Sequence, residues 1–265
     1  MIDLHMHSVY SDGTYTVEQI IAEAKALGLK QIAITDHNIL KGSVIGSQIS
    51  DIDFVVGIEL SVDYKGSEVH LLGYFPNGSD YSNVNFIIKE KNAYKKMAIM
   101  EMIENLNDMG VDLDLLDLSK FAKGTINRVH ICMALKEKGI IKSIQEGFEN
   151  YVGEHCKAYV ETKTISLAEA CDAIHEDGGI AVIAHPYEYE DVGPIDDFLN
   201  EVVKLVDGIE CYHPSATLEN SLHLVDVATA NNKIITGGSD FHGDNKPNIT
   251  IDMMKVDEKY MIKRK

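Results

Sequence analysis

The chain begins with two histidines, His5 and His7, which are two residues apart and are followed closely by Asp12. On an extended strand, side chains alternate between the two faces, so both imidazoles point to the same side and can reach one metal ion. One such pair is weak evidence, but residues of the same kinds recur at or just beyond later apolar runs. These residues are His37, Glu59, His70, His185, His213, Asp240 and His242. Their regular recurrence indicates one shared site.

The elements that would position these residues follow a simple pattern. Apolar runs of strand length alternate with helical patterns, which is typical of repeated βα units and a mainly parallel sheet. Strands are expected at residues 2–6, 32–35, 54–60, 69–75, 181–184, 208–212 and 234–237. The fourth is expected to be antiparallel to its neighbour because the gap before it is short. Helices are expected at residues 17–27, 167–177, 196–205 and 219–231. Seven strands predict a barrel of the α/β class.

The strand pattern stops after Pro76. Residues 89–109 are patterned as a long amphipathic helix and residues 128–138 as another, with no strong strand between them. We therefore predict a helical insertion over residues 81–159. It would interrupt a barrel domain that is built from residues 1–80 and 160–265.

In a βα barrel, the loops that follow the strands converge on one mouth, where residues far apart in the sequence meet. The candidate residues are histidine, aspartate and glutamate without cysteine, a mixture that suits manganese, iron or zinc. They outnumber the ligands of one ion, so we predict two or three divalent ions. Ions about 3.5–4 Å apart can hold a hydroxide and clamp a phosphate for in-line attack on phosphorus.

Composition limits the classes of partner. With 42 acidic and 24 basic residues, the formal net charge of −18 argues against binding to long nucleic acid by counterion release. A small anionic substrate remains compatible because a metal cluster supplies local positive charge. The chain has no long uncharged apolar run, no leader pattern and no C-x-x-C pair among its four cysteines. These features predict a cytoplasmic protein without a membrane segment.

Five motifs in order, HMHSVYSDGT, AITDHN, GIELS, AHP and GSDFHG, resemble those of the PHP family, named for polymerase and histidinol phosphatase. The resemblance spans nearly the whole chain. It implies a distorted, seven-stranded TIM-like barrel with a trinuclear metal site, in which a metal-activated hydroxide hydrolyses phosphoesters.

The resemblance also implies a ligand set. The first metal would be held by His5, His7, Glu59 and Asp240. The second would share Glu59 and add His70 and His185, and the third would take Asp12, His37 and His242. Asp36 is expected outside this set, where it would orient an imidazole or satisfy a turn.

Two residues are candidates for contact with the substrate. Arg128 lies in Asn127-Arg128-Val129-His130, which resembles the segment that small-molecule phosphoesterases of the family use to contact a substrate phosphate. A guanidinium offers two donors to phosphate oxygens, although a solvated surface arginine is the alternative. His213 could donate to the substrate phosphate or the leaving oxygen, or be a structural histidine. Structural or solvent roles are expected for His130, His155, His175 and His223.

The favoured hypothesis is a metal-dependent phosphoesterase that hydrolyses small phosphomonoesters, preferably nucleotides. The insertion and the segment around Arg128 look most like the branch that dephosphorylates nucleoside 3′,5′-bisphosphates and trims short RNA from its 5′ end. One alternative is a histidinol-phosphate phosphatase, whose branch lacks a helical insertion of this kind. Another is a non-catalytic PHP interaction module, which loss of ligands would signal, and none is lost here.

Overall fold

The structure, a computed structural model, describes residues 1–121 and 126–264. Residues 122–125, which fall in the predicted helical insertion, and residue 265 lie outside the described residues. The chain divides into two compact units. We call Met1–Ile87 with Ile165–Lys265 the barrel unit, and Ile88–Thr164 the helical unit.

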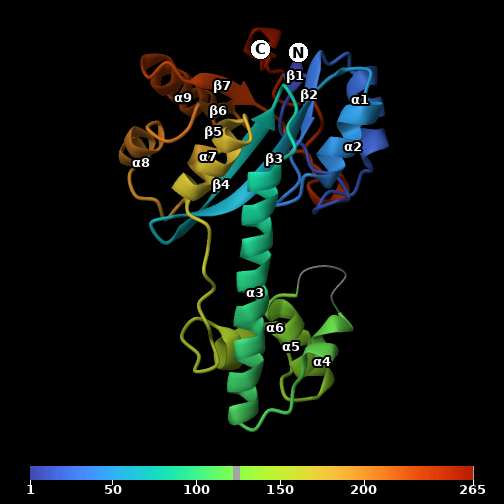
Figure 1. Cartoon of the computed structure of the whole chain (residues 1–265), viewed down its shortest axis with the longest axis vertical. Helices are drawn as coiled ribbons and strands as arrows, with labels where there is room; N and C mark the ends of the chain where they lie inside the picture. The colour runs from blue at the N-terminus through green and yellow to red at the C-terminus, as the bar shows by residue number, and fades with distance from the viewer. Residues whose placement is uncertain (122–125, 265) are drawn as a thin grey trace. The chain divides into compact units, whose positions relative to one another are not determined.

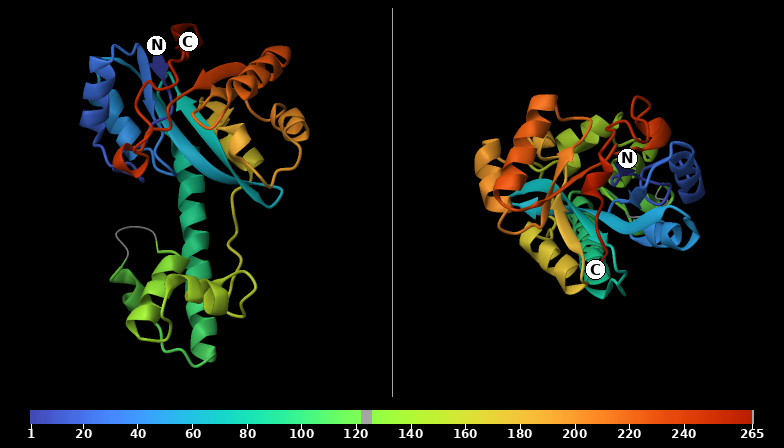
Figure 2. Two further views of the ribbon diagram at one scale, coloured as in Figure 1. Left: turned by 180° about the vertical axis from the view of Figure 1, so that it is seen from behind. Right: turned by 90° about the horizontal axis from the view of Figure 1, so that it is seen from above.

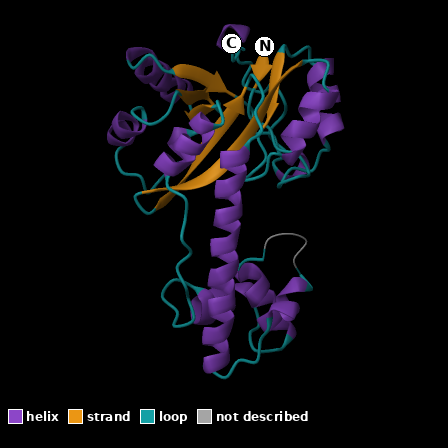
Figure 3. Ribbon diagram, in the orientation of Figure 1, coloured by secondary structure: helices purple, strands orange, loops and turns teal. Residues whose placement is uncertain are grey.

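The barrel unit contains a seven-stranded sheet whose strands follow one another in chain order. Figure 3 shows the strands gathered in this unit. The strands are β1 (Ile2–Asp3), β2 (Gln31–Ile34), β3 (Asp53–Tyr64), β4 (Ser67–Phe75), β5 (Ile180–Ile183), β6 (Gly208–Tyr212) and β7 (Ile234–Gly237). β4 is antiparallel to both neighbours, and the other pairs are parallel. Beyond β1, the Leu4 N–H donates to the Gly237 carbonyl at 3.2 Å, and Met6 bridges to Phe241. The sheet is therefore a nearly closed barrel, which confirms the predicted fold class.

Five α-helices accompany this sheet: α1 (Val17–Ala26), α2 (Lys41–Ile49), α7 (Leu167–Glu176), α8 (Ile195–Val202) and α9 (Leu218–Ala230). Short 3-10 helices follow at η2 (Pro186–Glu188), η3 (Gly243–Asn245) and η4 (Glu258–Tyr260). Helices α1 and α2 lie on one flank of the sheet and α8 and α9 on the other (Figures 1 and 2). Their starts are set by local chemistry: Thr16 and Ser166 form capping boxes at α1 and α7.

Helix α2 was not predicted from the sequence. Its buried face is made of small residues, Gly42, Ser43 and Gly46, so it lacks the apolar stripe of an ordinary amphipathic helix. A Cβ atom at Gly46 would clash with the ring of Phe54, and one at Gly42 would clash with the carboxylate of Asp36. Because α2 packs closely, its buried positions hold small residues, and its sequence lacks the apolar periodicity that marks the other helices.

Helix α3 (Ser82–Asp108) begins in the barrel unit, where Asp177 accepts hydrogen bonds from the N–H groups of Asn83 and Val84 at 3.1 and 2.9 Å. The helical unit continues with α4 (Leu115–Ser119), α5 (Arg128–Glu137), α6 (Ile144–Gly147) and the π-helical turn η1 (Phe148–Val152). Its own core includes Met102, Leu106, Ile131, Leu135 and Val152. The described residues of this unit contain no strand. None of the described helices combines the length and apolarity that a bilayer span requires.

Candidate metal centre

Glu59 is the central carboxylate of the site. It lies within β3, its side chain is 1% exposed, and its two oxygens approach five imidazoles at 2.8–3.3 Å. Oε2 faces His5, His7 and His37, whereas Oε1 faces His70 and His185. Burial raises the pKa of Glu59, but the imidazoles, led by His5, offset this and hold the pKa well below its usual value. A carboxylate that presents each oxygen to a different set of imidazoles is suited to bridge two ions.

Asp240 is the second buried carboxylate, and its oxygens face different partners. Oδ1 lies 3.2–3.5 Å from ring nitrogens of His5, His7 and His242. Oδ2 lies 3.4 Å from His213 Nε2 and forms an ion pair with Lys246. Burial raises the pKa of Asp240, but His5, His213 and His7 offset this and hold it far below its usual value.

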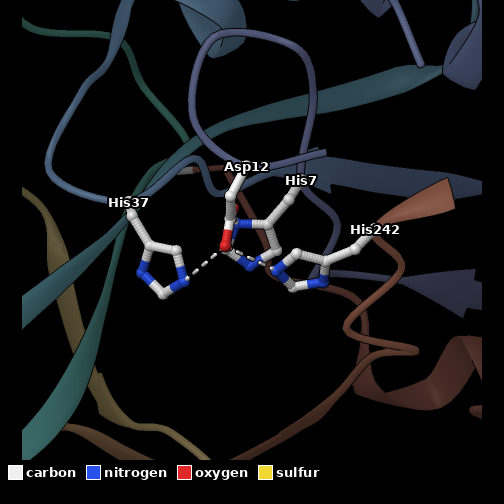
Figure 4. A group of neighbouring side chains, drawn as sticks. All are labelled: His7, Asp12, His37 and His242. Carbon is white, nitrogen blue, oxygen red and sulfur yellow. Dashed lines mark ion pairs between the residues drawn. The ribbon is translucent and has the colours of Figure 1, made fainter. Parts of the chain in front are cut away.

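Asp12 gathers a third group, which Figure 4 shows with His7, His37 and His242. Its Oδ2 atom lies between two rings, 3.3 Å from His242 Nε2 and 3.7 Å from His37 Nε2. Its Oδ1 atom lies 3.5 Å from His7 Nδ1. The Asp12 side chain is 52% exposed, so this group faces solvent more than the other two do.

The spacing of these atoms fits divalent ions. In the part of the chain that the structure describes, four groups of histidine, aspartate and glutamate each bring their ligand atoms within 4.8 Å of one another. The buried Nε2 atom of His7 forms no hydrogen bond, although oxygens of Glu59 and Asp240 lie 3.1 and 3.2 Å away. A buried ring nitrogen that faces two carboxylates without bonding to either is placed as a metal ligand would be. Imidazole and carboxylate donors without thiolate suit manganese, iron or zinc.

The imidazoles differ in protonation. Burial lowers the pKa of His7, but Asp240 and Glu59 offset this and raise it to about 9. Burial also lowers the pKa of His70, which Glu59 and Glu68 raise to about 9. Burial dominates at His37 and lowers its pKa to about 4. Metal binding must therefore displace protons from some of these rings at neutral pH.

Strand geometry explains why these residues meet. His5 and His7 follow β1, His37 follows β2, His185 follows β5, and Asp240 and His242 follow β7. The expectation that every candidate stands at or beyond a strand's end was wrong for Glu59, which lies inside the long β3, and for His70. His70 lies near the amino end of β4, and because β4 is antiparallel this end meets the same edge of the sheet.

Two of the candidates adopt a backbone conformation that is unusual for their residue types. His185 has a φ of 23° and Asp240 a φ of 53°. Positive φ in a residue other than glycine costs on the order of 1–3 kcal/mol and is concentrated at functional sites. The surrounding fold thus holds both side chains in the cluster against a local cost.

Asp36 has a supporting position. Its carboxylate accepts hydrogen bonds from the Ser8 N–H and hydroxyl, both at 2.7 Å, and from the Ser11 hydroxyl at 2.8 Å. It thereby satisfies the turn that connects His7 to Asp12.

Sequence reasoning missed Glu210, a fully buried residue of β6. Its Oε1 atom lies 2.9 Å from His5 Nδ1, and its Oε2 atom accepts a hydrogen bond from the His185 N–H at 2.8 Å. A carboxylate on the far nitrogen of a metal-binding imidazole fixes the tautomer and orientation of the ring. The sequence did offer one signal for it: a lone glutamate in the apolar strand GIECY. A buried acid is rare without a partner, so this glutamate could have been expected to face a charged or hydrogen-bonding group.

Glu210→Gln is expected to weaken manganese binding by about 10–100-fold, since glutamine keeps the shape of the side chain but loses the charge that orients His5. Calorimetric titration with manganese measures the affinity. Glu219→Gln, the same change at an exposed position of α9, is the control. Equal affinities for Glu210→Gln and the control would contradict this role.

The two candidates for substrate contact lie in different units. His213, in the barrel unit, is buried beside Asp240. Its Nδ1 atom accepts a hydrogen bond from the Ser215 N–H at 3.2 Å, which assigns the ring proton to Nε2. Arg128 begins α5 in the helical unit, with its guanidinium 5.5 and 5.3 Å from the ring centroids of Phe148 and Tyr159.

The remaining histidines bond to nearby groups outside the cluster. The pairs are His130 with Asn127, His155 with Glu149, His175 with Asp207, and His223 with Tyr187 and Asp196. These contacts agree with structural roles.

An acidic cavity of about 570 Å³ borders the cluster. It is lined by Gly66, Ser67, Glu68 and residues 188–192. Glu188 lies 3.3 Å from His185 Nδ1, and Glu68 lies 3.8 Å from His70 Nε2. Carboxylates also come from Glu190 and Asp191, so the cavity favours hydroxyl or ammonium groups over a second phosphate.

Comparison with known proteins agrees with this geometry. The family model described as PHP domain matches residues 3–199. The chain belongs to the PHP domain family. With the cluster of this PHP barrel intact, the protein is a metal-dependent phosphoric ester hydrolase.

Relatives of this PHP protein act on phosphate esters. It is 28% identical over 256 residues to a phosphoribosyl 1,2-cyclic phosphate 1,2-diphosphodiesterase of Eggerthella lenta, covering 91% of this chain and 94% of that protein. It is 28% identical over 255 residues to a 3′,5′-nucleoside bisphosphate phosphatase of Chromobacterium violaceum, covering 91% of this chain and 87% of that protein. A 5′-3′ exoribonuclease of Haemophilus influenzae is 26% identical over 194 residues, which cover 72% of this chain and 70% of that protein.

A solved structure shares the fold. It is that of a candidate metal-dependent phosphoesterase from Bifidobacterium adolescentis, which aligns with a TM-score of 0.69 at 25% identity. The alignment covers 98% of this chain and 93% of that one.

Proposed function

We propose that this PHP protein hydrolyses small phosphomonoesters and prefers nucleotides, either nucleoside 3′,5′-bisphosphates or the 5′ ends of short RNA. The observation that carries the proposal is the arrangement around Glu59, whose two oxygens face five imidazoles at the mouth of the barrel. Such a centre suits a clamp for a phosphoryl group. The preference for nucleotides is supported by the similarity to the bisphosphate phosphatase and the exoribonuclease.

We assign the ligands to three divalent ions of manganese, iron or zinc. One would be held by His5, His7, Glu59 and Asp240, and a second by Glu59, His70 and His185. Asp12, His37 and His242 would hold the third. Bound ions would polarise a phosphoryl oxygen and lower the pKa of a coordinated water.

His213 is proposed as a phosphate contact within the barrel unit. Its Nε2 atom carries the ring proton, is buried and forms no hydrogen bond. In our proposal this N–H donates to an oxygen of the phosphate or to the leaving oxygen. That hydrogen bond strengthens as negative charge develops on the oxygen.

Arg128 is proposed as a second phosphate contact. Its ring contacts hold the guanidinium in place, and among the described residues Nη1 donates to the Val152 carbonyl at 3.4 Å. A cavity of about 390 Å³ borders it, lined also by Gln145 and His155. The remaining donors can therefore meet a phosphate oxygen.

The acidic cavity favours a second group of candidates. Its carboxylates suit a substrate that carries an ammonium group, such as histidinol phosphate, or free ribose hydroxyls, as in a phosphoribosyl cyclic phosphate. Neither requires a second phosphate in that cavity.

The test is hydrolysis by manganese-loaded protein, measured as phosphate release from the monoesters and the cyclic ester and as release of nucleoside monophosphates from RNA. Substrates are nucleoside 3′,5′-bisphosphates, short 5′-phosphorylated RNA, nucleoside monophosphates, histidinol phosphate and a phosphoribosyl cyclic phosphate. We expect kcat/KM for the bisphosphates or short RNA to exceed the others. Preference for histidinol phosphate or the cyclic phosphate would replace the nucleotide assignment. No turnover of any of these compounds by metal-loaded protein would favour a substrate outside this panel or a non-catalytic role.

A further inference from the structure

Lys246 is a cation beside the cluster that the ion assignment leaves without a role. It follows η3 in the loop after β7, and its Nζ atom pairs with Asp240 Oδ2. Its side chain is 43% exposed, so it also faces solvent. Within the described chain, it is the one lysine or arginine paired with Asp12, Glu59, Glu210 or Asp240.

The chemistry of Lys246 leaves donors free. An ammonium group carries three protons, and the Asp240 oxygen accepts only one of them in a simple pair. Asp240 Oδ1 faces His5, His7 and His242, whereas Oδ2 faces His213 and Lys246, so the lysine lies on the side of this carboxylate away from the three proposed metal-binding imidazoles.

The loop holds Lys246 between two groups of the cluster. The Asn245 side-chain amide donates to the Asp12 carbonyl at 2.6 Å, and the Asp244 N–H donates to the Thr14 hydroxyl at 2.9 Å. The loop is thus tied to the Asp12 segment on one side and to Asp240 on the other. A preorganised donor loses little conformational entropy when a ligand binds.

The barrel mouth around Lys246 is rich in negatively charged carboxylates. The cluster, the Asp12 side and the acidic cavity all present carboxylates, in a chain with a net charge of −18. A lysine beside the cluster can pair with an incoming phosphate as a point charge, in addition to any metal ions.

We propose that Lys246 is a substrate-positioning residue, which donates to a non-bridging phosphate oxygen with the protons that Asp240 does not accept. This inference rests on the proposed phosphoester hydrolysis. Lys246 keeps its protons throughout, and the phosphoryl group passes to water. The residue sets the position of the phosphate relative to Asp240 and supplies no nucleophile.

The test compares Lys246→Met and Lys246→Arg with Lys25→Met, which removes a lysine from an exposed ion pair with Asp51. The binding of inorganic phosphate to manganese-loaded protein is measured by calorimetry, together with metal content, KM and kcat. Lys246→Met is expected to raise the Kd for phosphate, and the KM, by about tenfold or more. Lys246→Arg should recover most of the affinity, while Lys25→Met behaves as wild type and all variants retain their ions.

Several outcomes would overturn the role of Lys246. Unchanged phosphate affinity in Lys246→Met, or no phosphate binding by the wild-type protein, would show that Lys246 does not contact phosphate. Loss of ions from both Lys246 variants would mean that Lys246 only supports Asp240. Failure of the proposed function is a separate result, because wild-type protein that binds phosphate but turns over no substrate in the panel contradicts that function and not the phosphate contact.

Discussion

Replacing Glu59 by glutamine is expected to reduce kcat/KM by about 10³-fold or more and to release most of the bound metal. Both Glu59 oxygens face imidazoles, so this single change removes a negative charge from the surroundings of five rings. Breaking a buried charge pair costs about 3–5 kcal/mol, which corresponds to a factor of this size. Metal content by mass spectrometry and steady-state kinetics measure the two effects.

The control for Glu59→Gln is Glu219→Gln, which makes the same chemical change at an exposed helical position. We expect the control to keep both metal and activity. A Glu59→Gln protein that retains full metal content and loses less than about tenfold in kcat/KM would refute the bridging assignment. Circular dichroism of both variants separates loss of metal from loss of fold.

The barrel could be predicted because most of its strands are short and apolar and are separated by helical patterns of the usual length. The antiparallel β4 was predictable because the short gap between the strands expected at residues 54–60 and 69–75 leaves no room for a crossover helix, and the structure narrows that gap to two residues. Helix α2 could not be predicted because Gly42 and Gly46 replace the apolar residues that usually mark a buried helical face.

The candidate site shows a similar limit. Histidines beyond strand ends are conspicuous in a sequence, and the structure places them close together. Glu59 was found through its motif, although its place inside β3 follows from the length of that strand. Glu210 was missed because nothing in a sequence shows which imidazole a buried carboxylate will face. The division of the ligands among three ions stays a prediction.

The pH dependence of thermal stability should change sign when metal is added. In the presence of a chelator, His7 and His70 have pKa values of about 9, above the ordinary 6.5. A raised pKa stabilises the fold fully below pH 6.5, and this contribution is lost as the pH rises toward 9. We expect a loss of at least about 2 kcal/mol over this window, or roughly 5 °C in Tm. His37, with its pKa of about 4, adds no slope above pH 6.5 and destabilises only as the pH falls toward 4.

With saturating manganese, Tm should instead rise between pH 6.5 and 9. Metal ions compete with protons for the same imidazoles, so their affinity increases as the rings lose protons, and a ligand that binds the folded state stabilises it. Thermal unfolding followed by circular dichroism, at matched pH with EDTA or manganese, measures both slopes. Glu59→Gln should flatten both slopes of Tm against pH. Without metal, the slope falls because Glu59 raises the pKa of His7 and His70, and with metal it falls because Glu59 is a proposed ligand. Parallel curves with and without metal would show that the ions bind elsewhere, since only ligands shared by protons and metal can reverse the slope.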